Sequence, residues 1–495
     1  MGLDMKRWVT STILVLTLCT TVTLVLTLLA TKTTLPPGTK FGLVFDAGSS
    51  HTSLFVYQWP ADKENDTGVV SQTMACDVQG DGISSYAYNP EAAGRSLQPC
   101  LDEAVKLIPA AQLAQTPVYL GATAGMRLLS LVDPEAADQV LAKVGKTIQE
   151  YPMDFRGARI ISGAEEGAYG WITINYLLDT FTKYSVKNGG WIHPPATKVF
   201  GALDLGGAST QISFLPSGSI ADPATASHFR LYGFNYTIYT HSYLCYGQAQ
   251  VQKQVILKLS QESQDTSGQV KHPCYHKGFT NKVMAQSIYD SPCTAYMQPR
   301  GFNLSQEMIL VGTGNVTKCQ QAIRAIFNFT ACGPYHPCAF NSTYQPAVSG
   351  QFFAFSAFFY TFDFLNITSG QSLSEVVDTI EQYCGRSWTD VTGSYPKHKL
   401  HRLQDYCANA NYILILLLEG YKFSEKSWTS IRFQQKASGT DIGWTLGYML
   451  NLTNIIPVEA PIHARTQEER LWVTSIFFLV LTLITVLVLL LTYNL

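Results

Sequence analysis

Two short segments of the chain repeat one pattern, D-x-G-[SG]-[SA]-x-T, and together they restrict the fold more than any other feature. The first runs from Phe41 to Tyr57 around Asp46, and the second from Phe200 to Phe214 around Asp204. In each, an apolar run rich in β-branched and aromatic residues precedes the aspartate, and a similar run follows the bend. This pattern predicts a strand, a tight turn and a second strand. Two related hairpins indicate a duplicated domain that holds a phosphate chain between its copies.

Glycine and serine at these bends allow backbone N–H groups to approach an anion closely. The aspartates are suited to hold a hydrated divalent cation beside that anion. The alternative is that each aspartate only caps its own turn. The residues predicted to contact phosphate are Ser49, Ser50 and His51 in the first turn and Gly206, Gly207 and Ala208 in the second.

A third small-residue loop, Gly121 to Gly125, follows a short apolar run at 116–120 that is predicted to be a strand. The carboxyl ends of strands in α/β sheets are where ligands bind, so Thr123 is a further predicted phosphate contact. The loop could instead only permit close packing of a helix. For Arg127, contact with phosphate and pairing with a surface acid are equally compatible with the sequence.

Two adjacent acids, Glu165 and Glu166, follow a predicted strand at 158–162 and begin a predicted helix. Acids at a helix N-terminus are usually explained by the helix dipole. A hydrolase, however, needs a carboxylate that orients and deprotonates water, and these two are the best placed in the chain. Spacing alone does not choose between them.

Both ends of the chain are apolar. Trp8 to Ala30 and Leu471 to Leu495 contain no charged residue, and each is long enough to cross a bilayer. A cleaved signal peptide or a removed lipid-anchor signal would be expected to show a small-residue cleavage or attachment site, and neither segment has a clear one. The sequence therefore predicts transmembrane helices over 8–30 and 471–493.

Lys6 and Arg7 precede the first predicted span and favour a cytoplasmic N-terminus of residues 1–7. The expected location is the plasma membrane, with two spans, both termini in the cytoplasm and the central part outside. Membrane lipid is then a partner, and threonine-bearing faces of the spans could support a homo-oligomer. The chain has 34 basic and 36 acidic residues, so nucleic acid is not an expected partner.

Acceptor sequons and cysteines agree with an oxidising, extracytoplasmic space. The predicted glycosylation sites are Asn65, Asn235, Asn303, Asn315, Asn328, Asn341, Asn366 and Asn451. Of 11 cysteines, Cys19 lies in the first apolar segment, and the other ten can pair. Short loops favour the pairs Cys76–Cys100, Cys332–Cys338 and Cys384–Cys407, and leave Cys245, Cys274, Cys293 and Cys319 to close a local subdomain.

The alternation of predicted strands and helices indicates an α/β fold with a partly parallel sheet. Helical spacing of apolar residues occurs at 93–108 and 134–151. The aromatic run from Phe352 to Phe364 would by default be core, although Tyr360 could stack on a purine with an arginine on its other face.

Five segments together resemble the ecto-nucleoside triphosphate diphosphohydrolases, the apyrase family, and specifically its cell-surface branch. They are Asp46–Ser53, Gly121–Arg127, Gly163–Trp171, Asp204–Gln211 and Asp441–Asn451, in family order. The resemblance implies two ribonuclease-H-like domains of the actin, hexokinase and heat-shock ATPase superfamily. Lobe I would comprise 38–161 and 428–461, and lobe II 162–427. The family pattern departs at Ala164, where many relatives have glutamine.

The resemblance also implies roles for individual residues. Glu166 would be the catalytic base, and Ser209 would help to hold the attacking water. Asp46, Asp204, Gln211 and Trp444 would surround Ca²⁺ or Mg²⁺, mostly through water, while Tyr360 and Arg402 would hold the base. The resemblance adds the disulfides Cys245–Cys293 and Cys274–Cys319.

The function expected from these features is extracellular hydrolysis of nucleoside tri- and diphosphates such as ATP, ADP, UTP and UDP to monophosphate and inorganic phosphate. This activity would terminate or modulate purinergic signalling. Two alternatives are a sugar-kinase-like transferase, against which the sequons argue because it needs cytosolic ATP, and a nucleotide receptor without activity. A receptor would be expected to lack Asp46, Glu166 or Asp204, and all three are present.

Overall fold

The structure is a computed structural model that describes residues 2–34, 38–185, 190–195, 198–263, 268–300, 303–456, 462–465 and 469–493. It divides into two compact units. One comprises Thr39–Ile456, and the other joins Met1–Gly38 to Pro457–Leu495. The division into lobes I and II within the first unit stays a prediction.

The terminal unit contains two helices in contact, α1 (Gly2–Ala30) and α16 (Glu469–Tyr493). Next to them β1 (Thr31–Thr34) pairs antiparallel with β20 (Ile462–Arg465). Threonine hydroxyls in α1 donate to carbonyls one turn earlier, as from Thr12 to Trp8 at 2.8 Å and from Thr21 to Thr17 at 2.7 Å.

The prediction of two membrane spans is wrong. A span needs about 20 consecutive, mostly apolar residues, and no helix within the described residues has both the length and the apolar character required. The predicted two-span location at the plasma membrane, with both termini in the cytoplasm, is wrong with it, whereas the lipid contact and the homo-oligomer stay predictions.

The first sheet of the Thr39–Ile456 unit has the order β4-β3-β2-β5-β6. Its strands are β2 (Thr39–Ala47), β3 (Thr52–Pro60), β4 (Ser71–Val78), β5 (Pro117–Ala122) and β6 (Asp154–Ile160). The pairs β4/β3 and β3/β2 are antiparallel, whereas β2/β5 and β5/β6 are parallel. The predicted first hairpin is thus confirmed as β2 and β3.

The second sheet repeats this arrangement and has the order β11-β12-β10-β9-β16-β17. Its strands are β9 (Gly201–Leu205), β10 (Ser209–Phe214), β11 (Ala226–Leu231), β12 (Phe234–Leu244), β16 (Phe352–Ser356) and β17 (Ile431–Phe433). The pairs β12/β10 and β10/β9 are antiparallel, and β9/β16 and β16/β17 are parallel. Apart from the edge strand β11, both sheets have the strand order that a duplicated unit predicts.

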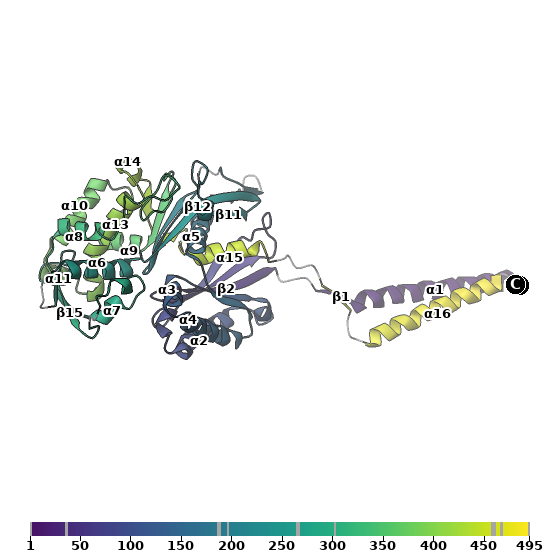
Figure 1. The fold of residues 1–495 in the computed structure, drawn as a ribbon. Coiled ribbons are helices and arrows are strands. Elements are labelled where there is room, and N and C mark those ends of the chain that lie inside the picture. Colours follow the sequence, from purple (N-terminus) through teal and green to yellow (C-terminus); the bar gives the residue numbers. More distant parts are fainter. Residues whose placement is uncertain are drawn as a thin grey trace. The chain divides into compact units, whose positions relative to one another are not determined.

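Helices fill the space on both faces of each sheet (Figure 1). On one face of the first sheet lie α2 (Pro90–Leu107) and α4 (Pro134–Gln149). Its other face shares a core with the second sheet, filled by α5 (Gly163–Leu177) and α15 (Trp444–Thr453). The outer face of the second sheet packs on α9 (Ala357–Phe364), α10 (Leu373–Cys384) and α13 (Tyr406–Ile415).

The remaining elements are mostly insertions between β12 and β17. The helices are α3 (Ala124–Val132), α6 (Gln248–Glu262), α7 (Ala285–Tyr289), α8 (Val316–Arg324), α11 (Trp388–Ser394), α12 (Leu400–Leu403), a π-helix (Leu416–Gly420) and α14 (Glu425–Trp428). The strands are β7 (Lys183–Ser185), β8 (Gly190–Ile192), β13 (Gln269–His272), β14 (Thr280–Met284), β15 (Glu307–Gly312), β18 (Lys436–Ala437) and β19 (Thr440–Asp441). Five disulfides join Cys76–Cys100, Cys245–Cys293, Cys274–Cys319, Cys332–Cys338 and Cys384–Cys407.

The helices α5 and α15 approach each other most closely at Gly447. A Cβ at this position would overlap the backbone oxygen of Tyr169, which cannot move without moving α5. We expect Gly447→Ala to lower the free energy of unfolding by roughly 1–3 kcal/mol, the usual cost of overpacking. Gly393→Ala in α11 is the matched control, because a Cβ there meets no atom. Urea denaturation of both variants measures the effect, and equal stabilities would contradict it.

Candidate active site

Asp46 and Asp204 occupy the same position in the two hairpins, one residue before the ends of β2 and β9. Each faces a polar residue across its hairpin, Ser53 in the first and Gln211 in the second. The two turns then meet, since a Cβ on Gly207 would lie 2.8 Å from the Ser49 hydroxyl oxygen. The repeated turns therefore come together at one place in the fold.

The loop after β5 packs against the first of these two turns. The Thr123 N–H donates to the Ala47 carbonyl at 3.0 Å, and Thr123 is the residue before α3. A Cβ on Gly125 would lie 2.8 Å from the Ser49 Cα, so only glycine allows this approach. Ser50 and His51, bonded to each other at 3.1 Å, are exposed beside it. All three small-residue loops predicted to bind phosphate are thus adjacent.

The second turn is supported from behind by the start of α6. The Gln248 and Ala249 N–H groups donate to the Gly206 and Gly207 carbonyls, each at 2.9 Å. The Cys245 N–H donates to the Ala208 carbonyl at 2.9 Å, and Cys245 is held by its disulfide to Cys293. These contacts fix the backbone that would face a phosphate.

The structure separates the two adjacent acids. Glu165 forms a capping box with Ser162 and an ion pair with Arg159 at 2.8 Å. Burial alone would raise the pKa of Glu165, but the bonds from Arg159 and Ser162 outweigh it and hold the pKa below its ordinary value. Glu166 instead points inward and is only 9% exposed. Of the pair, only Glu166 lies beside the small-residue loops.

Glu166 sits in a hydrogen-bond network drawn from four elements. The Arg127 guanidinium of α3 forms an ion pair with its carboxylate, and the Gln211 amide of β10 donates to it at 2.9 Å. The same amide lies 2.7 Å from the Ser209 hydroxyl and 3.1 Å from that of Ser242 in β12. Arg127 therefore pairs with a buried acid. The sequence had suggested only contact with phosphate or pairing with a surface acid for this residue.

Three carboxyl groups of this site have raised pKa values. Burial raises the pKa of Asp46 to about 6 and that of Asp204 to about 6. Burial also raises the pKa of Glu166 to about 8, with Arg127 opposing this and the charges of Asp204 and Asp46 adding to it. A group of three carboxyls, with Glu166 buried and Asp46 and Asp204 half-buried, favours a positively charged ligand.

The residues predicted to surround a divalent cation fit one. Asp46 Oδ1, Asp204 Oδ1 and Gln211 Oε1 are buried, and none of these three oxygens has a hydrogen-bond partner within the described part of the chain. Trp444 Nε1 is buried beside Asp46, where it opposes the rise in the Asp46 pKa that burial causes. Carboxylate and amide oxygens are hard ligands of the kind Ca²⁺ and Mg²⁺ take, directly or through water. An indole N–H can only donate, so Trp444 would contact a metal-bound water. Trp444 is placed against β5 because Gly121 leaves room for its ring.

Tyr360 and Arg402 are brought close enough to interact. Burial raises the pKa of Tyr360, with a further raising effect from Asp441 and a lowering one from the Arg402 cation. Asp77 also acts on Tyr360, and it accepts a hydrogen bond from Ser53 at 2.8 Å. Tyr360 lies in α9, which directly follows Ser356 at the end of β16, the strand paired with the Asp204 strand β9.

Other predicted sites lie elsewhere. Seven of the eight sequon asparagines are exposed, and Asn451 in α15 is half-buried.

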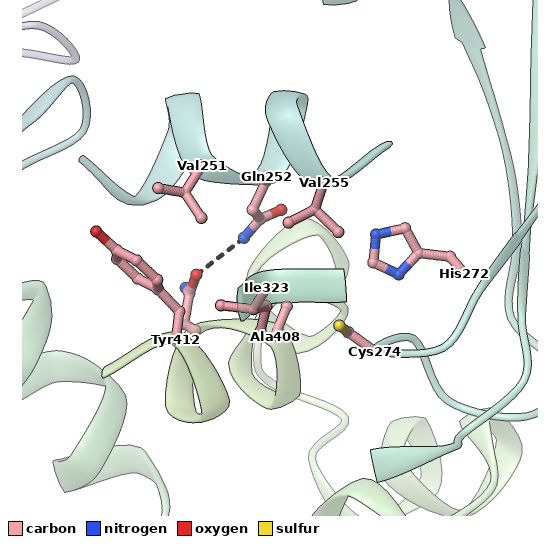
Figure 2. A pocket seen from close by; sticks show the side chains of 9 residues that line it. Val251, Gln252, Val255, His272, Cys274, Ile323, Ala408 and Tyr412 are labelled. Carbon is pink, nitrogen blue, oxygen red and sulfur yellow. Dashed lines mark hydrogen bonds between the residues drawn. The ribbon is translucent and has the colours of Figure 1, made fainter. Parts of the chain in front are cut away.

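Figure 2 shows a small, almost wholly apolar cavity between α6 and α13. It is lined by Val251, Gln252, Val255, His272, Cys274, Ile323, Ala408, Asn409 and Tyr412, none of which is a candidate site residue. No residue of the loops predicted to bind phosphate lines the cavity.

Two residues at the site carry no sequence signal. Ser242 lies in β12, opposite Gln211, in a run of alternating residues that predicts only a strand. Ser356 ends β16 with a φ of 55°, a left-handed conformation that is costly for serine, and it lowers the pKa of Asp204. The pairing of β16 with β9 sets Phe355 opposite Asp204 and so places Ser356 beside Asp204. This pairing cannot be read from the sequence.

Comparison with known proteins gives consistent results. The model of the GDA1/CD39 (nucleoside phosphatase) family matches residues 32–465. Ectonucleoside triphosphate diphosphohydrolase 8 of Rattus norvegicus is 54% identical over 458 residues, 92% of this chain and 91% of the relative. The protein of that name from Homo sapiens is 51% identical over 457 residues, with coverages of 92% and 91%.

More distant proteins match over similar lengths. Ectonucleoside triphosphate diphosphohydrolase 2 of Rattus norvegicus is 48% identical over 459 residues, 92% of this chain and 91% of the relative. The crystal structure of nucleoside triphosphate hydrolases from Neospora caninum is similar in fold, with a TM-score of 0.59 at 15% identity, and covers 84% of this chain and 93% of that one. By the family match and these identities, the chain belongs to the GDA1/CD39 (nucleoside phosphatase) family.

Proposed function

We propose that the protein hydrolyses nucleoside tri- and diphosphates to the monophosphate and inorganic phosphate. The observation that carries this proposal is the meeting of the two aspartate turns at Ser49 and Gly207 beside the buried Glu166. A phosphate chain held by the turns would have a carboxylate base next to its terminal phosphorus. The names of the relatives support the same substrate class.

In this reaction water attacks the terminal phosphorus in line, and the bond between that phosphorus and the bridging oxygen breaks. Glu166 takes the proton from the attacking water. Ser209, bonded to the Gln211 amide at 2.7 Å, holds that water next to Glu166. Phosphate oxygens are held by Ser49, Ser50, His51 and Thr123 and by the backbone of Gly206, Gly207 and Ala208.

A divalent cation, Ca²⁺ or Mg²⁺, fits the buried oxygens of Asp46, Asp204 and Gln211. When bound, it would offset the negative charge of the phosphate chain. The residues that hold it come from both hairpins and from α15, so the site depends on the packing of both sheets around α5 and α15.

The fold is proposed to consist of two ribonuclease-H-like domains, residues 38–161 with 428–461 and residues 162–427. The shared strand order of the two sheets supports a duplication. The proposed substrates are extracellular nucleotides. Their hydrolysis would terminate or modulate purinergic signalling. Five disulfides support this, because they are typical of oxidising compartments.

Tyr360 and Arg402 are proposed to hold the nucleotide base. Stacking of a base on an aromatic ring is worth about 1–3 kcal/mol. We expect Tyr360→Ala to raise KM for ATP about tenfold with little change in kcat. Tyr335→Ala is the control, because Tyr335 is 40% exposed, comparable with 51% for Tyr360, and lies outside the site. An unchanged KM in Tyr360→Ala would exclude this role.

Release of inorganic phosphate from ATP, ADP, UTP and UDP by the purified chain tests the function. Phosphate should appear with Ca²⁺ or Mg²⁺ present and the nucleoside monophosphate should accumulate. Transfer of phosphate to an added sugar would indicate a kinase, and nucleotide binding without phosphate release would indicate a receptor. Either result with folded protein would reject the proposal.

A further inference from the structure

Ser242 lies among the residues around Glu166, and among the described residues its hydroxyl has hydrogen bonds to Gln211 and Arg127 rather than to Glu166 itself. Its hydroxyl is 3.1 Å from the Gln211 amide nitrogen and 3.4 Å from Arg127 Nη1. Both of these groups donate directly to Glu166. One hydroxyl on β12 therefore accepts from the two side chains that hold the proposed base.

Packing gives Ser242 a second link to Glu166. A Cβ on Gly163 would overlap both the side chain of Ser242 and the guanidinium of Arg127. Gly163 is the first residue of α5, and Glu166 lies three residues further along the same helix. The helix that carries the base thus begins directly against Ser242, with no room between them for a side chain.

Arg127, Gln211 and Ser242 come from three separate elements of the fold. Arg127 is on α3 next to the first sheet, Gln211 is on β10 in the second, and Ser242 is its antiparallel partner on β12. Arg127 is largely buried, with 14% of its side chain exposed, so water competes little for these bonds. Ser242 contacts Arg127, Gln211 and the start of α5. The Ser209 hydroxyl also accepts from Arg127, at 3.4 Å, and from Gln211, at 2.7 Å, but Ser209 is the residue proposed to hold the attacking water.

We infer that Ser242 is a positioning residue that fixes Gln211 and Arg127 against Glu166 and so sets the direction of the base. The inference rests on the proposed function. Without the hydroxyl, the Gln211 amide loses one of its acceptors and Arg127 can turn away from its place beside α5. Substrate contacts made by the turns and by Tyr360 would remain.

Ser242→Ala tests this, with Ser213→Ala as the matched control. Ser213 is a buried serine on β10 whose hydroxyl bonds that of Thr240 on β12 at 2.7 Å, two positions along the same strands from the Gln211 and Ser242 pair. Both variants lose one hydroxyl from the same strand pair, but only one loses contact with the network. We expect kcat to fall about tenfold in Ser242→Ala with KM for ATP within about twofold, and both constants to stay within about twofold in Ser213→Ala.

A second readout does not depend on turnover. Because Gln211 is a proposed cation-shell residue, the rise in thermal midpoint on adding Ca²⁺ should shrink in Ser242→Ala and stay as in the parent in Ser213→Ala. Equal kcat in both variants, or equal losses in both, would overturn the inference. Failure of the parent protein to release phosphate would instead count against the proposed function, whereas an unchanged Ca²⁺ shift in Ser242→Ala would count against the inference alone.

Discussion

Glu166→Gln is expected to lower kcat for ATP by about a hundredfold to ten-thousandfold, the range over which a positioned base contributes. The amide has nearly the shape of the carboxylate but cannot take a proton from water. Thermal unfolding should show that the fold is kept, because the glutamine side-chain oxygen can still accept from Arg127 and from the Gln211 amide. Phosphate release under saturating ATP measures the effect.

Glu165→Gln provides the control for this experiment. It removes the charge that pairs with Arg159, while glutamine can still complete the capping box with Ser162. We expect kcat to change less than about twofold. If Glu165→Gln lost activity and Glu166→Gln kept it, the assignment of the base would be reversed.

Chelation of divalent cations is expected to stop phosphate release and to lower the thermal midpoint most at alkaline pH. Folding raises the pKa of Asp46 and Asp204 from 3.8 to about 6 and that of Glu166 from 4.5 to about 8. Between about pH 4 and 8 the folded, cation-free protein therefore holds more protons than the unfolded chain. Its stability must fall as pH rises through this window.

A bound cation favours the ionised carboxylates and should reverse this loss. The midpoint should therefore rise more on adding Ca²⁺ at pH 8.5 than at pH 5, which differential scanning calorimetry can measure. Asp204→Asn should reduce the difference between the two pH values. A cation shift that is the same at both pH values would show that these carboxylates do not hold the ion.

The two aspartate hairpins could be predicted from the sequence because each has a local pattern of apolar runs on both sides of a small-residue bend. Spacing alone could not choose between Glu165 and Glu166, and only the family resemblance favoured Glu166. That choice depends on Ser162 and Arg159, which bind the first acid and leave the second to face inward. Local capping, rather than the acids themselves, decides which one lies at the site.

Features that depend on contacts between distant parts of the chain were harder to predict from the sequence. The aromatic run from Phe352 was predicted to be core without a defined secondary structure. It changes from strand β16 to helix α9 at Ser356, where φ is 55°. The partners of Arg127 and the role of Ser242 depend on pairing between distant strands, which no local pattern encodes. At the termini an apolar sequence was interpreted as two spans, and the described helices do not support that interpretation.

The position of α15 has a consequence for biosynthesis. This helix, made near the end of the chain, covers the face of the first sheet that includes Val44, Tyr57 and Trp59, which are made near its start. A nascent chain emerging from the ribosome therefore keeps that face open until Trp444 and the residues after it are available. Exposed apolar surface of this kind is what chaperones bind. Truncation before α15 should consequently yield a protein retained by chaperones rather than a smaller folded domain.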